Sequence, residues 1–118
     1  YVRTLAVPAR RNVTDTFVKE GEKIFAQINC SGCHKPTIYT AVDVTLPVIS
    51  NQRIHPYTDL LLHDMGDELA DNRPDFLATG NEWRTPPVWG GEAEQSKQKF
   101  TQLSSADRNA LLQFLKSL

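Results

Sequence analysis

The segment Cys30-Ser31-Gly32-Cys33-His34 restricts the folding of this chain more than any other feature. It holds the only two cysteines among 118 residues, and a histidine directly follows the second one. Two thiols one helical turn apart are placed to add to the two vinyl groups of a haem, while the next residue brings an imidazole under the iron. The small residues between the cysteines let the backbone lie close to the porphyrin edge. The pattern predicts one haem c, covalently attached through Cys30 and Cys33, with His34 as the proximal ligand.

The cysteine pair has three other interpretations. The first is a structural disulfide, or a pair that occurs by chance. A thioredoxin-like redox pair would stand at the start of a helix after a buried strand, whereas this pair follows a predicted helix. A zinc site would need Cys30, Cys33 and two of the three histidines, His34, His55 and His63, and the chain lacks paired HxxxH spacing. The adjacent histidine favours haem.

The iron needs a second axial ligand, and Met65 is the only methionine in the chain. It stands beside Gly66 at the end of a predicted short helix. His63 and His55 are the competing ligands, and either would give bis-histidine ligation with a lower potential than a His/Met pair. An open position would instead permit peroxide or gas chemistry. Iron saturated by His34 and Met65 indicates electron transfer.

Helical periodicity appears near both ends of the chain. An apolar stripe begins after Asp15 (Phe17, Gly21, Ile24, Phe25, Ile28), with Thr14 or Asp15 as N-cap, and a second closes the chain (Leu111, Phe114, Leu115, Leu118) after a capping arrangement of Ser104 and Asp107. Thr58 or Asp59 would cap a short helix through residues 60–62. No segment alternates with period two. We therefore expect a mostly α fold with long ordered loops, residues 1–14 forming an arm or linker and residues 15–118 a c-type cytochrome domain.

Composition excludes several functional classes. Thirteen Lys and Arg balance fourteen Asp and Glu, and Arg10-Arg11 is the only adjacent basic pair, so the chain has no electrostatic footprint for nucleic acid. No apolar stretch approaches the roughly 20 residues of a membrane-spanning helix. A hydrolase triad, a P-loop and a glycine-rich dinucleotide motif are all absent from the sequence.

Further segments carry a family resemblance. These are residues 51–66 (NQRIHPYTDLLLHDMG), residues 68–71 (ELAD) and residues 82–87 (EWRTPP) with Trp89-Gly90. Together with residues 30–34 they resemble the C-terminal cytochrome c domain of the bacterial di-haem oxidoreductases, also called putative di-haem peroxidases or thiol oxidoreductases. The resemblance extends from about Asp15 onward. It implies a cytochrome c-like fold with crossed N- and C-terminal helices, a short helix before the distal ligand and long loops around one haem.

The resemblance also implies roles for individual residues. Cys30 and Cys33 would attach the haem, and His34 and Met65 would bind the iron. The helices would cross through Gly21 and Phe25 against Leu111, Phe114 and Leu115. A carbonyl near Pro36 or Pro47 would orient the His34 ring. Arg84 is the candidate partner of a haem propionate, and three aromatic residues are candidates for the haem edge, Trp83, Trp89 and Tyr57.

Acidic residues surround the methionine. Six acids (Asp59, Asp64, Asp67, Glu68, Asp71, Asp75) face one base, Arg73. Such a region is ordinarily a solvated face. The functional hypotheses are a docking patch over residues 59–75 for a basic redox partner, and a calcium site formed by Asp64, Asp67, Glu68 and Asp71.

The sequence thus predicts a mono-haem, single-electron carrier, the relay half of a di-haem oxidoreductase. The alternative is a peroxidase or thiol oxidoreductase with an open or displaceable distal site, acting with a second haem domain. A single CxxCH means one haem, so enzymatic activity is expected only with such a partner. Because thioether attachment occurs outside the bacterial inner membrane, the resemblance implies a periplasmic protein.

Overall fold

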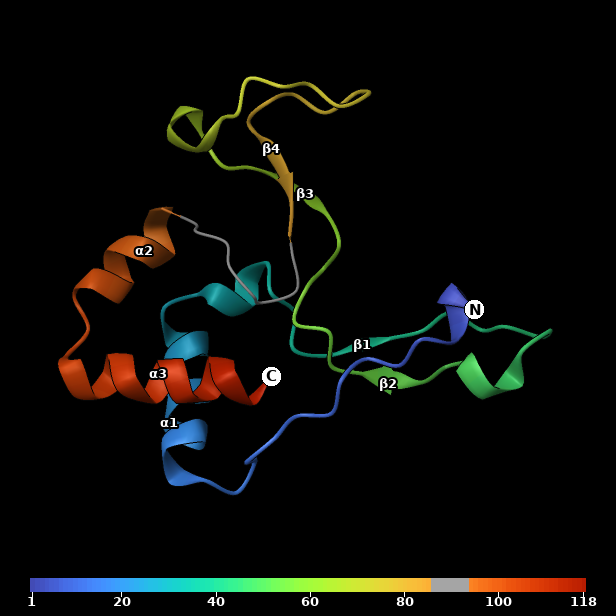
Figure 1. The fold of residues 1–118 in the computed structure, drawn as a ribbon, viewed down its shortest axis with the longest axis horizontal. Helices are drawn as coiled ribbons and strands as arrows, with labels where there is room; N and C mark the ends of the chain where they lie inside the picture. The colour runs from blue at the N-terminus through green and yellow to red at the C-terminus, as the bar shows by residue number, and fades with distance from the viewer. Residues whose placement is uncertain (86–93) are drawn as a thin grey trace.

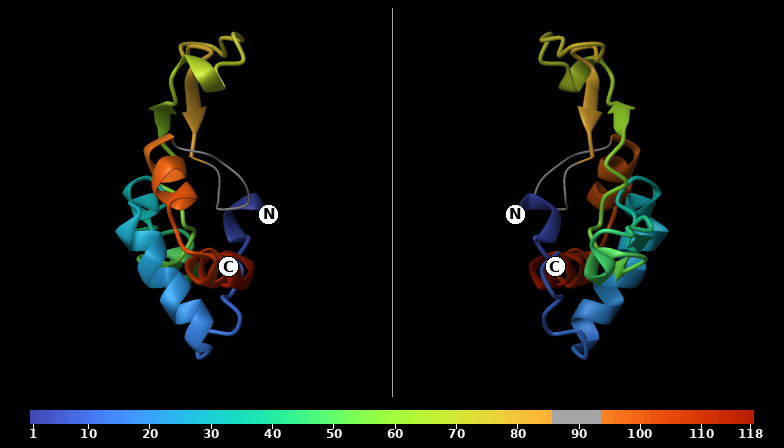
Figure 2. Two further views of the ribbon diagram at one scale, coloured as in Figure 1. Left: turned by 90° about the vertical axis from the view of Figure 1, so that its left-hand side faces the viewer. Right: turned by 90° about the vertical axis from the view of Figure 1, so that its right-hand side faces the viewer.

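The computed structural model describes residues 1–85 and 94–118. The molecule is thin, measuring 49 × 42 × 19 Å, as the edge-on views show (Figure 2). Its radius of gyration is 16.3 Å, whereas a compact domain of this length would have about 13.5 Å. The excess arises because the segments that form two small two-stranded sheets both project away from the helices (Figure 1).

The first helix, α1 (Thr16–Gln27), confirms the helix predicted after Asp15. The Asp15 carboxylate accepts hydrogen bonds from Phe17 N (2.7 Å) and Val18 N (3.2 Å), which makes it the N-cap. Beyond α1, Asn29 turns the chain with φ 68° into the short 3₁₀ helix η2 (Cys30–Gly32). The cysteine segment therefore begins just after the C-terminal end of α1.

The last helix, α3 (Ser105–Ser117), runs across α1 (Figure 1). Ser104 caps it, its hydroxyl accepting from Asp107 N at 3.1 Å, as the sequence predicts. Phe25 and Phe114 meet with ring centroids 5.3 Å apart. The buried hydrophobic core consists of Val18, Ile24, Phe25, Ile28, Tyr57, Ala110, Leu111 and Phe114, with Leu115 packed against it. The expected packing of the two terminal helices is confirmed.

The prediction of a mostly α, cytochrome c-like fold is wrong. A helix absent from the prediction, α2 (Glu94–Thr101), precedes α3. Two antiparallel two-stranded sheets are also present: β1 (Ile38–Tyr39) with β2 (Arg53–Ile54), and β3 (Leu62–Asp64) with β4 (Glu82–Arg84). Strands of two or three residues are too short to show period-two alternation, so the sequence pattern did not reveal them.

The predicted short helix at residues 60–62 is likewise wrong. Leu60 has φ 61°, a left-handed conformation that a right-handed helix excludes. The two candidate caps are engaged in local turns, because Thr58 Oγ1 accepts from Leu60 N (3.0 Å) and Asp59 Oδ1 accepts from Leu61 N (3.0 Å). These turns start strand β3 in place of a helix. The remaining 3₁₀ helices are η1 (Val2–Thr4), η3 (Pro47–Ile49) and η4 (Asp67–Leu69).

The N-terminal segment lies against the rest of the chain. Arg3 pairs with Asp43, and Arg11 N donates to Ser117 O at 2.7 Å, at the end of α3. An open pocket of about 810 Å³ is lined by residues 3–10 together with residues of β2 and η3. Across the described residues, no helix combines the length and hydropathy needed to cross a membrane.

Candidate functional site

The cysteine segment lies at the C-terminal end of α1. Cys30 and Cys33 are both half-buried, and no disulfide joins them. His34 N donates to Cys30 O at 2.9 Å, which closes a tight turn over the pair. The turn places the His34 side chain beside Phe25, their ring centroids 6.2 Å apart.

The ring of His34 is oriented by a backbone carbonyl. Its Nδ1 lies 3.0 Å from Tyr57 O. A carbonyl oxygen only accepts, so Nδ1 carries a hydrogen, and in the neutral ring Nε2 is the nitrogen whose lone pair can bind another partner. The expected acceptor near Pro36 or Pro47 is therefore wrong. Pro36 O instead faces the Nδ1 of His55 at 2.9 Å.

The β3–β4 hairpin contacts the cysteine segment through His63. Its Nδ1 lies 3.6 Å from Cys33 Sγ, and its Nε2 lies 2.9 Å from Asp59 Oδ2. Burial raises the pKa of the Asp59 carboxyl, but hydrogen bonds from Leu61 N, Thr85 and His63 outweigh it and hold the pKa below the ordinary 3.8. Asp59 is thus a carboxylate that anchors His63.

Met65 follows β3 directly and continues its pairing, since Met65 N donates to Asn81 O at 2.9 Å. Side chains alternate along a strand, so Met65 lies on the same face as His63. Trp83, the cross-strand partner of His63, shares this face. The face that contacts Cys33 through His63 thus also carries the methionine and an indole.

Arg84 and Tyr57, two other predicted site residues, do not lie on the hairpin face that carries His63. Arg84 pairs in register with Leu62, on the opposite face of the hairpin from His63, and is exposed. Tyr57 is 4% exposed within the helical core. Trp89 lies outside the described residues.

The proposed metal clusters find no support. Within residues 1–85 and 94–118, no three His, Cys, Asp or Glu side chains gather as a metal ion requires. The acids expected to bind calcium serve their own loops: Asp64 accepts from Gly66 N, Asp67 from Asn81 Nδ2 and Asp71 from Arg73 N.

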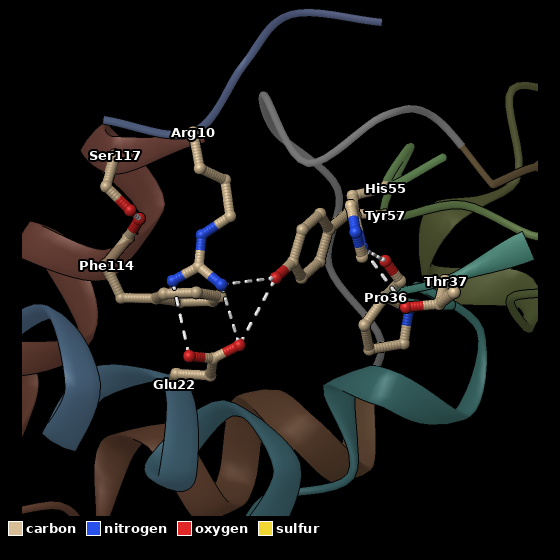
Figure 3. A network of polar contacts seen from close by, with 8 residues as sticks. All are labelled: Arg10, Glu22, Pro36, Thr37, His55, Tyr57, Phe114 and Ser117. Atoms are coloured by element: carbon tan, nitrogen blue, oxygen red, sulfur yellow. Dashed lines mark hydrogen bonds and ion pairs between the residues drawn. The ribbon is translucent and has the colours of Figure 1, made fainter. Parts of the chain in front are cut away.

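One network was not predicted from the sequence (Figure 3). Arg10 donates to both oxygens of Glu22, at 2.8 and 3.2 Å, and to Tyr57 Oη at 3.2 Å. Burial raises the pKa of the Tyr57 phenol above 10.0, with Arg10 opposing this and Glu22 adding to it. Arg10 and Tyr57 are 47 residues apart, so no local pattern signals their contact.

Comparison with known families gives the class of the protein. Residues 1–91 match the family model described as "Di-haem oxidoreductase, putative peroxidase". The chain belongs to this family. No curated protein and no solved structure matches it. Membership implies haem binding, and because the family name refers to two haems while this chain has one CxxCH, it also implies a second haem domain.

Proposed function

We propose that this chain is a single-electron relay, with haem c attached through Cys30 and Cys33 and its iron bound by His34 and Met65. The observation that carries the proposal is the 3.0 Å contact between His34 Nδ1 and Tyr57 O. It leaves Nε2 as the coordinating atom, the arrangement found for histidines that bind metals.

The residues present fit a haem. The two thiols stand beside the imidazole on one turn, and no disulfide blocks them. On the hairpin face that carries His63 and Met65, the large apolar ring of Trp83 is 44% exposed. A flat, largely apolar macrocycle would cover part of this surface.

When bound, haem supplies the one-electron couple of its iron. The chain's own residues set its environment. Cys30 and Cys33 would hold the macrocycle by thioether bonds, and Tyr57 O orients the His34 ring. Met65 presents a thioether, a ligand that raises the potential relative to a second histidine and closes the iron to peroxide.

Spectroscopy of the exported protein tests the proposal. We expect a pyridine-haemochrome spectrum of c type and an intact mass one haem above that of the polypeptide. Cys30→Ala/Cys33→Ala should lose the covalent haem, whereas Thr37→Ala, a matched change just beyond the segment, should retain it. A wild-type chain that carries no haem would overturn the proposal.

We also propose a periplasmic location, because covalent attachment of haem c occurs outside the bacterial inner membrane. Expression with and without a periplasmic export signal tests this: covalent haem should form only in the exported chain. Attachment in the unexported chain would contradict it.

A second candidate function is peroxide reduction, favoured by the family description. It requires an open distal site and the second haem domain. A high-spin oxidised spectrum with peroxide turnover would establish this function in place of the relay.

The acidic region 59–75 supplies a docking surface in this proposal. Asp64, Asp67, Glu68, Asp71 and Asp75 are all exposed. Electron transfer with a small basic redox protein should slow as salt increases, and Asp67→Asn/Glu68→Gln/Asp71→Asn should weaken that salt dependence. An unchanged salt dependence would exclude this surface.

A further inference from the structure

The carbonyl that orients His34 belongs to a residue in an unfavourable backbone conformation. Tyr57 has φ 51°, in the left-handed region that side-chain-bearing residues seldom occupy. Such a conformation persists only where surrounding contacts impose it. The position of Tyr57 O therefore depends on what holds the Tyr57 side chain.

The Tyr57 ring contacts aromatic side chains of both core helices, α1 and α3. It packs edge-on against Phe25 (6.0 Å, 76°) and Phe114 (5.7 Å, 68°). At its far end the hydroxyl accepts from Arg10 Nη1 at 3.2 Å and donates to Glu22 Oε1 at 3.4 Å. The two polar contacts join the hydroxyl end of the ring to the N-terminal segment and to α1.

Arg10 itself is immobilised. Its guanidinium lies over the Phe114 ring at 5.1 Å and forms the two hydrogen bonds to Glu22 on α1 (Figure 3). The next residue, Arg11, is bonded through its backbone N–H to Ser117 O. The N-terminal segment is thus joined to both core helices at the point where it meets Tyr57.

We infer that Arg10 and Glu22 are positioning residues for His34, acting through the Tyr57 hydroxyl to hold Tyr57 O against His34 Nδ1. The inference rests on the proposed role of His34 as an iron ligand. A hydrogen bond from Nδ1 makes the imidazole a stronger donor and favours oxidised iron, so loosening the contact raises the reduction potential.

Two variants test this without changing net charge. Tyr57→Phe keeps the ring and removes the hydroxyl, and Arg10→Gln/Glu22→Gln removes the ion pair. Both should raise the reduction potential of the haem. The matched control is Glu20→Gln/Lys23→Gln, which breaks an exposed ion pair of the same helix and should leave the potential unchanged.

A second measurement follows the contact itself. Solvent exchange of the His34 Nδ1 proton, measured by NMR with the iron reduced and diamagnetic, should accelerate in both variants and not in the control. This readout also applies to a chain without haem, so failure of the proposed function is distinguishable from failure of the inference. Wild-type exchange and wild-type potential in both variants would overturn the inference.

Discussion

Gly21 of α1 lies directly against the backbone of Ala110 in α3. A Cβ atom on Gly21 would stand 2.1 Å from Ala110 O and 2.7 Å from Phe114 Cβ, both shorter than real contacts. The two helices therefore approach each other through a position that tolerates no side chain. Because the end of α1 carries the cysteines, this contact also sets where the candidate haem site begins.

Gly21→Ala is expected to destabilise the protein. Glycine to alanine inside a helix ordinarily stabilises it by about 0.5–1 kcal/mol, but here the added methyl forces α1 and α3 apart, at a cost of about 1–3 kcal/mol or more. Urea unfolding measures the effect. Gln27→Ala, at an exposed position of the same helix, should be nearly neutral. Equal stability of Gly21→Ala and wild type would show that the helices do not meet here.

Thr58 ties the base of the β3–β4 hairpin to the core. The residue is 2% exposed, and its hydroxyl donates to Thr85 O at 2.6 Å and accepts from Leu60 N at 3.0 Å. Thr58→Val leaves both backbone groups without this partner, so we expect a loss of about 1–3 kcal/mol in the free energy of unfolding. Thr58→Ser keeps the hydroxyl and should retain most of the wild-type free energy of unfolding. Denaturant midpoints that rank Val above Ser would contradict the assignment.

Spectroscopy distinguishes Met65 from His63 as the second axial ligand of the iron. With Met65 bound, the oxidised protein should show a weak far-red sulfur-to-iron band. Met65→Ala should abolish the band and lower the reduction potential or open the site, whereas His63→Ala should keep the band because His63 contacts Cys33 and Asp59. A band missing from the wild type, together with a spectrum altered only by His63→Ala, would assign the iron to His63.

We expect the loop around Asp43 to be sensitive to acid. The Thr45 hydroxyl, followed by Leu46 N, lowers the pKa of its carboxyl from 3.8 to about 2, with Arg3 making the smallest contribution. A lowered folded-state pKa stabilises the folded form above the ordinary value, and this contribution is lost as the pH falls through about 2. Carboxyl chemical shifts measured during an acid titration should give a pKa of about 2 for Asp43.

Two substitutions separate the causes of the Asp43 shift. Thr45→Val should move the pKa back toward 3.8 more than Arg3→Gln does, since the hydroxyl is the larger cause. The reverse order would mean that the ion pair to the N-terminal segment dominates.

The accuracy of the sequence-based predictions followed the range of the interactions involved. Asp15 and Ser104 cap helices through atoms two or three residues away, so both helix starts were predictable. The same reasoning was wrong at Thr58 and Asp59, where equally local hydrogen bonds favour a turn because Leu62 pairs with Arg84 and requires a strand there. Local propensity did not decide between helix and turn, and the distant strand did.

The sequence by itself determined which residues are the candidate ligands, since the CxxCH segment, the single methionine and the family motifs all indicate them. The tertiary structure alone decided their surroundings: that Tyr57 orients His34, that His63 meets Cys33, and that Arg10 lies beside Tyr57. The physical reason is separation along the chain. These contacts join residues 23, 30 and 47 positions apart, so they depend on how the helices and loops pack together and not on any local sequence pattern.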